Sequence, residues 1–427
     1  MTNIADGSDQ ILFRGKDEVA GYILDGILAN RKRKIGTEIE MFLVDGNGRA
    51  ISCSDGQKAF AEFKRVFALR GYDSFLIYEQ DAEGRKTIFG LDVPGLGTIT
   101  PEIGHQFEFS SSVCETAEEI REKNSEFFCA VREVAARMGF FPVFCGHIPG
   151  YVETTEGSYR SRSIEWHRYF KSRFGADSLP VCETLDATAS TQVSLDSGGE
   201  RFHEFFQALL LIEPAFSLHY ANSLRRHVGV TQMLPSHIKP ITSVWRAGSA
   251  KEAVEHIVDR LMYLEVPFLP DPEHPQIYKA EPLLGRCPPT VEDLMFHGRL
   301  NGKILNNVGG FLLSRPAVRR FSQGILEMRG VDAQDSPEKV AEIAQRVMTL
   351  VYNDEVRKDL LSSYEHLNVF DIAMMHKAAS LPNLQEALDF QVAGIKMSDF
   401  IDDVFDRSET VETPPVYFNA CEYMATA

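Results

Sequence analysis

The sequence of 427 residues lacks the features that mark several large classes of protein. No run of about 18 apolar residues occurs, so no membrane-spanning helix and no membrane partner are expected. The net charge is −17, and the longest basic run is only Arg31–Lys34. Because binding of nucleic-acid phosphates needs a basic footprint, no nucleic-acid partner is expected either.

Cysteine is scarce as well, with seven scattered residues and no Cys-x-x-Cys pair. An odd, dispersed set is typical of reduced thiols rather than of a disulfide framework or a thiolate metal site. The N-terminus is polar and carries an acid early, which is wrong for a signal peptide. These observations together predict a cytoplasmic protein.

Three common motifs of catalytic sites are also missing. The sequence contains no P-loop of the form GxxxxGK[ST], no Rossmann glycine fingerprint after a strand and no GxSxG nucleophile motif. Any chemistry therefore has to come from another kind of site.

Acidic and amide side chains at alternate positions are what the sequence does have. They occur in GTEIEMF (36–42), TPEIGHQFEF (100–109), STQVSLD (190–196) and ILEMRG (325–330). Alternate residues of a β-strand point to the same face, about 6.6–6.8 Å apart. The shared polar face would carry Glu38, Glu40, Glu102, Gln106, Glu108, Gln192, Ser194, Asp196, Glu327 and Arg329. We therefore predict one sheet with an apolar back and a concave acidic front.

Such a front needs positive charge, because closely spaced carboxylates repel and raise one another's pKa. Carboxylate oxygens on rigid strands suit Mg²⁺ or Mn²⁺. Arginines are also expected nearby: Arg329 on the polar face, Arg225 after a helix end, and Arg168 and Arg173 after a polar loop at 150–165. Metal ions that neutralise a triphosphate and arginines that bind phosphate are the requirements of phosphoryl transfer from ATP.

The remaining pattern predicts a single α+β domain over 1–427, built on an antiparallel sheet with helices on its back. The sheet core is expected at about 30–335, a helical part at about 336–406 and a loose tail at 407–427. Further strands are expected at 74–79, 86–91 and, buried, at 140–145. Helices are expected at 16–32, 59–67, 116–138, 200–220, 249–263, 354–364 and 384–394, with another starting at Pro337.

The ordered segments resemble the glutamate–cysteine ligases of the plant and proteobacterial type, within the glutamine synthetase-like carboxylate–amine ligases. GTEIEMF resembles the family's GTExExF, and ITPEIGHQFEFS resembles ISLEPGGQFELS. QVSLD at 192–196 resembles QVNLD, ANS at 221–223 and the following RRHV resemble ANS and RSHI, and LEMRGVD at 326–332 resembles LEMRGAD. Two departures are His105, where the family has glycine, and Gly229, where it has an aromatic residue.

The resemblance implies a glutamine synthetase-like fold and a two-step ligation. The γ-carboxylate of L-glutamate would attack the γ-phosphate of ATP, and an amine would then attack the γ-glutamyl phosphate. The acceptor would be L-cysteine, as in glutathione biosynthesis, or another amino acid or amine. Arg329 would bind the transferred phosphate and Arg225 a substrate carboxylate. Candidates for substrate or nucleotide binding are Gln106, Gln192, Ser194, Arg168 and Arg173, and the implied Mg²⁺ ligands are Glu38, Glu40, Glu102, Glu108 and Glu327.

Other interpretations stay open at this point. A guanidino-kinase-like phosphotransferase and a non-catalytic protein that binds glutamate or a nucleotide both fit parts of the pattern. Glu38 and Glu40 on an isolated strand would usually be a solvated face. His167, His219 and His227 have no spacing partner and are expected to be structural. The sequence leaves open the acceptor, the number of metal ions, the oligomeric state and whether loop 150–165 closes over the site.

Overall fold

An antiparallel sheet brings the acidic segments together at its centre. The computed structural model describes residues 11–29, 33–80, 85–102, 104–148, 161–175, 186–223, 240–270, 278–280, 288–309 and 315–409. In these residues the sheet has nine strands, ordered β10-β11-β7-β1-β5-β4-β3-β2, with β6 paired to β1. The strands are β1 (Ile35–Val44), β2 (Phe75–Gln80), β3 (Lys86–Val93), β4 (Gly97–Pro101), β5 (Phe107–Ser111), β6 (Phe141–Val143), β7 (Ser190–Asp196), β10 (Ala317–Arg319) and β11 (Ile325–Asp332).

Helices account for most of the other described residues. They are α1 (Lys16–Ala29), α2 (Cys53–Leu69), α3 (Ala117–Met138), α4 (Ser161–Phe174), α6 (Phe202–His219), α8 (Ala250–Met262), α9 (Val291–Phe296), α10 (Gly302–Gly309), α11 (Pro337–Tyr352), α12 (Asp354–Ser363), α13 (Val369–Ala379), α14 (Leu384–Asp389) and α15 (Met397–Glu409). Two small antiparallel pairs complete the elements, β8 (Phe268–Pro270) with β9 (Tyr278–Ala280) and β12 (Gln391–Val392) with β13 (Ile395–Lys396). The predicted α+β class with a large antiparallel sheet is confirmed.

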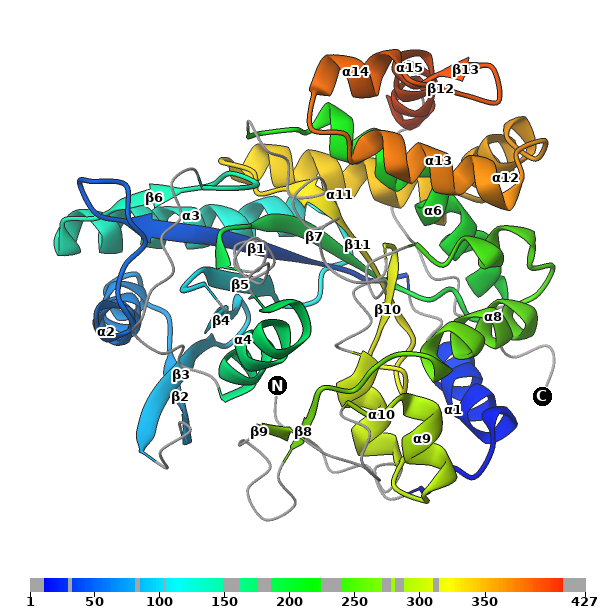
Figure 1. The fold of residues 1–427 in the computed structure, drawn as a ribbon. Coiled ribbons are helices and arrows are strands. Elements are labelled where there is room, and N and C mark those ends of the chain that lie inside the picture. Colours follow the sequence, from blue (N-terminus) through cyan, green and yellow to red (C-terminus); the bar gives the residue numbers. More distant parts are fainter. Residues whose placement is uncertain are drawn as a thin grey trace, which may run out of the picture.

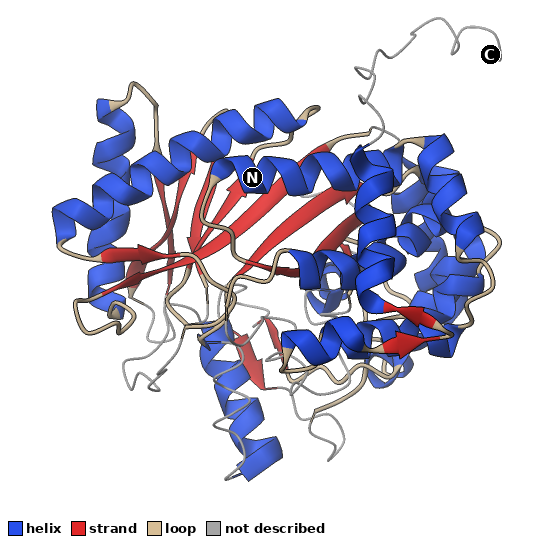
Figure 2. Ribbon diagram, turned by 90° about the horizontal axis from the view of Figure 1, so that it is seen from above, coloured by secondary structure: helices blue, strands red, loops and turns tan. Residues whose placement is uncertain are grey.

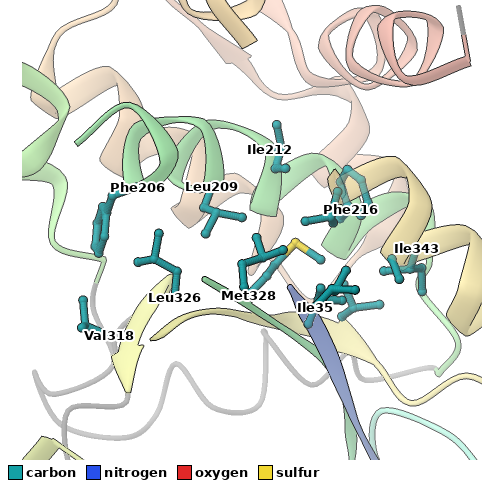
Figure 3. Close-up of a cluster of buried hydrophobic side chains, with 14 of the residues drawn as sticks. Ile35, Phe206, Leu209, Ile212, Phe216, Val318, Leu326, Met328 and Ile343 are labelled. Atoms are coloured by element: carbon teal, nitrogen blue, oxygen red, sulfur yellow. The ribbon is translucent and has the colours of Figure 1, made fainter. Parts of the chain in front are cut away.

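One face of the sheet is covered by α3, α11 and α6, which lie above the strands in Figure 1 and cross them in the view of Figure 2. The alternation in β1 explains this cover, because Thr37, Ile39, Met41 and Leu43 are at most 1% exposed. In β11, Leu326 and Met328 meet the apolar side of α6, as Figure 3 shows. The predicted apolar back is therefore confirmed. Helix α4 lies on the opposite side of the sheet (Figure 1).

Capping residues set the starts of the long helices. The Thr116 hydroxyl accepts a hydrogen bond from the Glu119 amide at 3.2 Å, and Ser249 and Ser336 cap α8 and α11 in the same way. Such a cap stabilises a helix by about 0.5–2 kcal/mol, since it satisfies an amide that has no partner within the helix. The predicted helix starts near 116, 249 and 337 are confirmed.

Segment 100–109 is not the single strand that we predicted. The chain reverses after β4, where the Glu102 amide donates to the Gln106 carbonyl at 2.8 Å, and it returns as β5. His105 has φ of 67°, a left-handed conformation that turns a chain but does not occur in a strand. The sequence did not reveal this turn, because the alternation of apolar and polar residues continues from β4 through the turn into β5.

Four smaller predictions are wrong in whole or, where part of the segment lies outside the described residues, in the part that is described. Strand β6 is not buried, since it pairs only with the end of β1 and leaves Phe141 60% exposed. The helix expected at 384–394 ends at Asp389, because Ala393 and Gly394, both with positive φ, form the turn between β12 and β13. Residues 161–165 of the expected loop begin α4, and 149–160 lie outside the described residues. Residues 407–409 of the expected tail complete α15.

No helix among the described residues is long and apolar enough to cross a membrane.

His376 on α13 gives a pH dependence that can be tested. Its ring Nε2 lies 2.8 Å from the Leu210 carbonyl of α6, and burial lowers its pKa to about 4. The unfolded chain takes up this proton near pH 6.5, whereas the folded chain does not, so the contribution of His376 to stability falls as the pH drops from about 6.5 to 4. The loss amounts to about 3 kcal/mol in total.

The measurement is urea unfolding between pH 4 and 7.5. His376→Gln keeps a donor for the Leu210 carbonyl but does not titrate, so its unfolding free energy should fall less steeply with acid. His366→Gln, at an exposed position, serves as the control and should follow the wild type. Equal slopes for wild type and His376→Gln would contradict the assignment.

Candidate active site

The strand register places the acidic side chains on one face, which is defined here as the polar face. Glu38 lies opposite Gln192, and Glu40 lies opposite Glu108. Directly opposed residues in an antiparallel pair project to the same side. On the next strand pair Glu327 lies opposite Ser194, so β5, β1, β7 and β11 all contribute to this face. The predicted side of these residues is therefore confirmed.

The hairpin of β4 and β5 brings Glu102, which follows the end of β4, and Glu108, on β5, to the same face. Thr100 pairs with Glu108, and Glu102 pairs with Gln106 one step further along the hairpin. The Gln106 side chain holds this turn: its Oε1 accepts from the Gly104 amide at 2.7 Å and its Nε2 donates to the Thr188 carbonyl at 2.7 Å. Gln106 therefore fixes the hairpin to the segment that leads into β7.

Glu40 is held by donors from β7. Its Oε2 accepts from the Ser190 amide at 2.7 Å and from the Ser190 hydroxyl at 3.1 Å, and its Oε1 accepts from Gln192 Nε2 at 3.0 Å. Gln192 is 1% exposed and also donates to the Ser190 hydroxyl at 3.0 Å. In this structure the amide of Gln192 orients Glu40.

Two arginines meet Glu327 at the other end of the polar face. Arg319 Nε donates to Glu327 Oε2 at 2.8 Å, and Arg329 Nη1 lies 2.9 Å from the same oxygen. The contact of Arg329 is an ion pair without hydrogen-bond alignment, since Nη1 is buried and has no aligned acceptor. Sequence reasoning missed Arg319. Its spacing from Ala317 is the one feature that points to it. Ala317 pairs with Glu327, and Arg319, two residues later in β10, projects to the same side.

A buried carboxylate on α6 fixes the backbone of Arg329. Glu213 is 1% exposed, and its Oε1 accepts from the Arg329 amide at 2.8 Å, where the pairing of β11 with β7 is interrupted. Burial raises the pKa of Glu213 to about 8, against the opposing effect of Arg315. This contact was also missed, because a glutamate followed by Pro214 in an apolar helix carries no sequence pattern for it.

Two carboxyl groups of the polar face, those of Glu38 and Glu40, have raised pKa values. Burial and then the neighbouring Glu327 hold the pKa of Glu38 well above its usual range, although Arg319 opposes this. Burial and then Glu102 raise the pKa of Glu40 to about 8, although its bonds to Ser190 oppose this. A bound cation would reverse both shifts, because an opposite charge favours the ionised carboxylate.

The donor set suits a hard divalent cation, since it consists of carboxylate oxygens. Within the described ranges, however, no three His, Cys, Asp or Glu side chains come together closely enough to hold a metal ion. Glu40 and Glu327 are instead held by the protein's own donors. The predicted metal site therefore stays a prediction, supported by the charge of the face and not by a formed coordination shell.

The other predicted residues have mixed outcomes. Ser194 lies on the polar face, with its hydroxyl 3.5 Å from Glu327 Oε1. Asp196 ends the strand, and its carboxylate accepts from the Lys34 amide at 2.9 Å. Arg168 forms an ion pair with Glu165 on its own helix, and Arg173 lies 3.2 Å from Glu265. Neither partner belongs to the acidic strands. Arg225 lies outside the described residues.

Comparison with known families confirms the resemblance inferred from the sequence. Residues 34–223, just under half of the chain, match the model of glutamate-cysteine ligase family 2. The match includes the first three acidic segments and Ala221–Ser223, whereas segment 325–330 lies beyond it. It indicates a ligase-type enzyme. Within the ligases, it indicates the group that forms γ-glutamyl amides. It does not identify the amine that is joined.

Two further comparisons add little. None of the curated proteins matches the chain. A solved structure described as apo GmaS without ligand is 12% identical, with alignment over 97% of this chain and 76% of that chain. Its TM-score is 0.32, which is too low to support any argument.

Gly104 gives a test of how the hairpin is held. A Cβ at this position would overlap the backbone of Asp186, so the turn can lie against that segment only with glycine. We expect Gly104→Ala to lower the unfolding free energy by about 1–3 kcal/mol, as overpacking of a buried contact does. Thermal unfolding should show the loss. Gly95→Ala, at a turn glycine with positive φ where an added Cβ would have no atom within 4 Å, is the control for backbone strain alone. A loss no greater than that of Gly95→Ala would contradict the close contact.

Proposed function

We propose that the chain is an ATP-dependent γ-glutamyl ligase with a glutamine synthetase-like fold, in which the polar face is a concave active-site floor. ATP would phosphorylate the γ-carboxylate of L-glutamate, and an amine would displace the phosphate to form an amide. The observation that carries the proposal is the placement of acids and arginines on one sheet face by segments that resemble this family in order. Three of these segments lie within the matched residues.

Divalent metal is part of the proposal. Mg²⁺ or Mn²⁺ would supply positive charge that neutralises the triphosphate. Its ligands would come from Glu38, Glu40, Glu102, Glu108 and Glu327. The raised pKa values of Glu38 and Glu40 support this role, because both carboxyls are buried and lie near other acids, Glu327 for Glu38 and Glu102 for Glu40. Binding requires Glu40 to exchange at least one of its bonds to Ser190 and Gln192 for the metal.

The arginine end of the polar face suits the transferred phosphate. Arg329 keeps an N–H without an aligned acceptor, even though it lies against Glu327. Arg319 and Glu213 hold the Glu327 side chain and the Arg329 backbone in place. An arginine whose position is fixed in this way binds an anion at little cost in side-chain entropy. Arg225, Arg168 and Arg173 remain candidates for contacts with substrate or nucleotide.

The amine acceptor defines the biological role. L-Cysteine would place the protein in glutathione-type biosynthesis, and another amino acid or amine would place it in a more specialised route. The family match does not distinguish these acceptors, so the acceptor has to be measured directly.

The test of function is ADP release with ATP, Mg²⁺ and L-glutamate. The acceptor panel contains L-cysteine, glycine, methylamine, ammonium chloride and hydroxylamine, and product masses are recorded alongside. We expect ADP and one γ-glutamyl product to appear together with at least one acceptor. If nucleotide or glutamate binds but no acceptor releases ADP, the chain is a binding protein or uses another carboxylate. A separate reaction contains ATP, Mg²⁺ and a guanidino compound. If phosphate moves to that compound and no amide forms with any amine of the panel, the chain is a phosphotransferase.

Glu38→Gln tests the metal assignment. We expect turnover to fall by about 10²-fold or more, since a carboxylate that balances a metal is lost. The melting temperature without metal should not fall, because the substitution removes a charge that burial disfavours. Mg²⁺ should stabilise the wild type against heat and the variant much less. Glu62→Gln on α2, which removes an exposed ion pair with Arg65, is the control. Full activity of Glu38→Gln would refute the assignment.

A further inference from the structure

A histidine and a buried aspartate form a pair on the polar-face side of the sheet. His167 Nε2, on α4, lies 2.8 Å from Asp186 Oδ1. The Asp186 side chain is 3% exposed, whereas that of His167 is 23% exposed. A carboxylate beside one ring nitrogen fixes the proton on that nitrogen, so the other nitrogen carries the free electron pair. The sequence did not show this pair, because its members are 19 residues apart.

The scaffold of the polar face holds Asp186 in place. Gly104, in the turn between β4 and β5, packs directly on the Asp186 backbone. Gln106 of the same turn donates to the Thr188 carbonyl at 2.7 Å. Glu102 is two residues before Gly104, so their Cα atoms are within about 7 Å. The pair of His167 and Asp186 therefore packs against the turn that carries Glu102. Helix α4, which carries His167, lies on the polar-face side of the sheet (Figure 1).

Charge divides the polar face along its strand order. Arg319 and Arg329 lie at the β10–β11 end, where an anionic phosphate would bind. Glu40 lies on β1, Glu108 on β5 and Glu102 just after β4, which are three, four and five strands away from β10 in the order of the sheet. The two ends lie within electrostatic reach of each other, since Glu38 and Glu108 as well as Glu327 raise the pKa of Arg319 against its burial. An incoming ammonium group is attracted to the acidic end, beside the phosphate. His167 is thus at the end of the face where a cationic acceptor would arrive.

We propose that His167 is the general base for the amine acceptor and that Asp186 orients it. This proposal rests on the proposed ligase function. The acceptor arrives as an ammonium ion, whose nitrogen has no free electron pair. His167 takes one proton, the nitrogen then attacks the acyl carbon of the acyl phosphate, and a C–N bond forms. The C–O bond to phosphate breaks with its electron pair, and the leaving phosphate takes the second proton. The amide nitrogen keeps the third.

His167→Asn separates this role from a structural one. Asparagine can still donate to Asp186 but cannot accept the proton. Hydroxylamine is uncharged at neutral pH, so it needs no base before it attacks the acyl phosphate. We expect the variant to lose about 10²-fold or more of its rate with the best amine of the acceptor panel. Its rate of hydroxamate formation with hydroxylamine should stay within about threefold of the wild type.

Two further variants complete the experiment. His256→Asn, at a partly buried histidine on α8, should behave as wild type with both acceptors. Asp186→Asn should also lose more rate with the amine than with hydroxylamine, because the histidine loses its orienting partner. Circular dichroism and thermal unfolding establish that each variant is folded.

The outcomes are distinct. A loss confined to the amine supports His167 as the base. Equal losses with amine and hydroxylamine, or no loss with either, overturn the inference while the ligase function stands. If wild-type protein releases ADP with neither hydroxylamine nor any amine, the proposed function itself fails, and the role of His167 fails with it.

Discussion

The position of β7 between β1 and β11 is the constraint on which the rest of the structure depends. It joins segments that are about 150 and 130 residues apart in the chain, because Glu38 pairs with Gln192 and Ser194 pairs with Glu327. On one side of these strands, the apolar residues pack against α3, α11 and α6 (Figures 1 and 3). The polar side chains at the alternate positions must then project from the opposite face of the sheet. The burial of the core thus concentrates like charges on the polar face.

The polar face is only partly neutralised by the chain itself. Glu327 has two arginines, and Glu40 has neutral donors from Ser190 and Gln192. Glu38 receives less compensation, and burial together with its proximity to Glu327 raises its pKa. Such an arrangement costs stability in the absence of a ligand, and it is what a site that binds cations and a polyphosphate needs. The fold offsets this cost elsewhere, in a core where residues such as Ile39 and Phe109 are fully buried.

The sequence predicted the sheet and the side of its acids because strict alternation depends only on the period of a strand. The alternation also placed Glu102 and Glu108 on the correct face, although segment 100–109 is a hairpin and not one strand. A hairpin preserves the alternation on both sides of its turn. Arg319 and Glu213 were not predictable in this way. Their roles depend on which strand or helix packs beside β11, and that is decided by tertiary contacts. His167 was expected to be structural, and its pairing with Asp186 likewise depends on the fold.

The order of strands also has a consequence for fragments of this protein. Residues 34–223, which carry the family match, contain β7 but not β11. Cut from the rest, this portion would present β7 as an open edge with unpaired backbone groups, and its apolar face would lack the cover of α11. Open edges of this kind recruit other strands, and the result is aggregation. During synthesis the same edge stays uncovered until residue 332 has left the ribosome, so the centre of the sheet closes only after more than three quarters of the chain has been made.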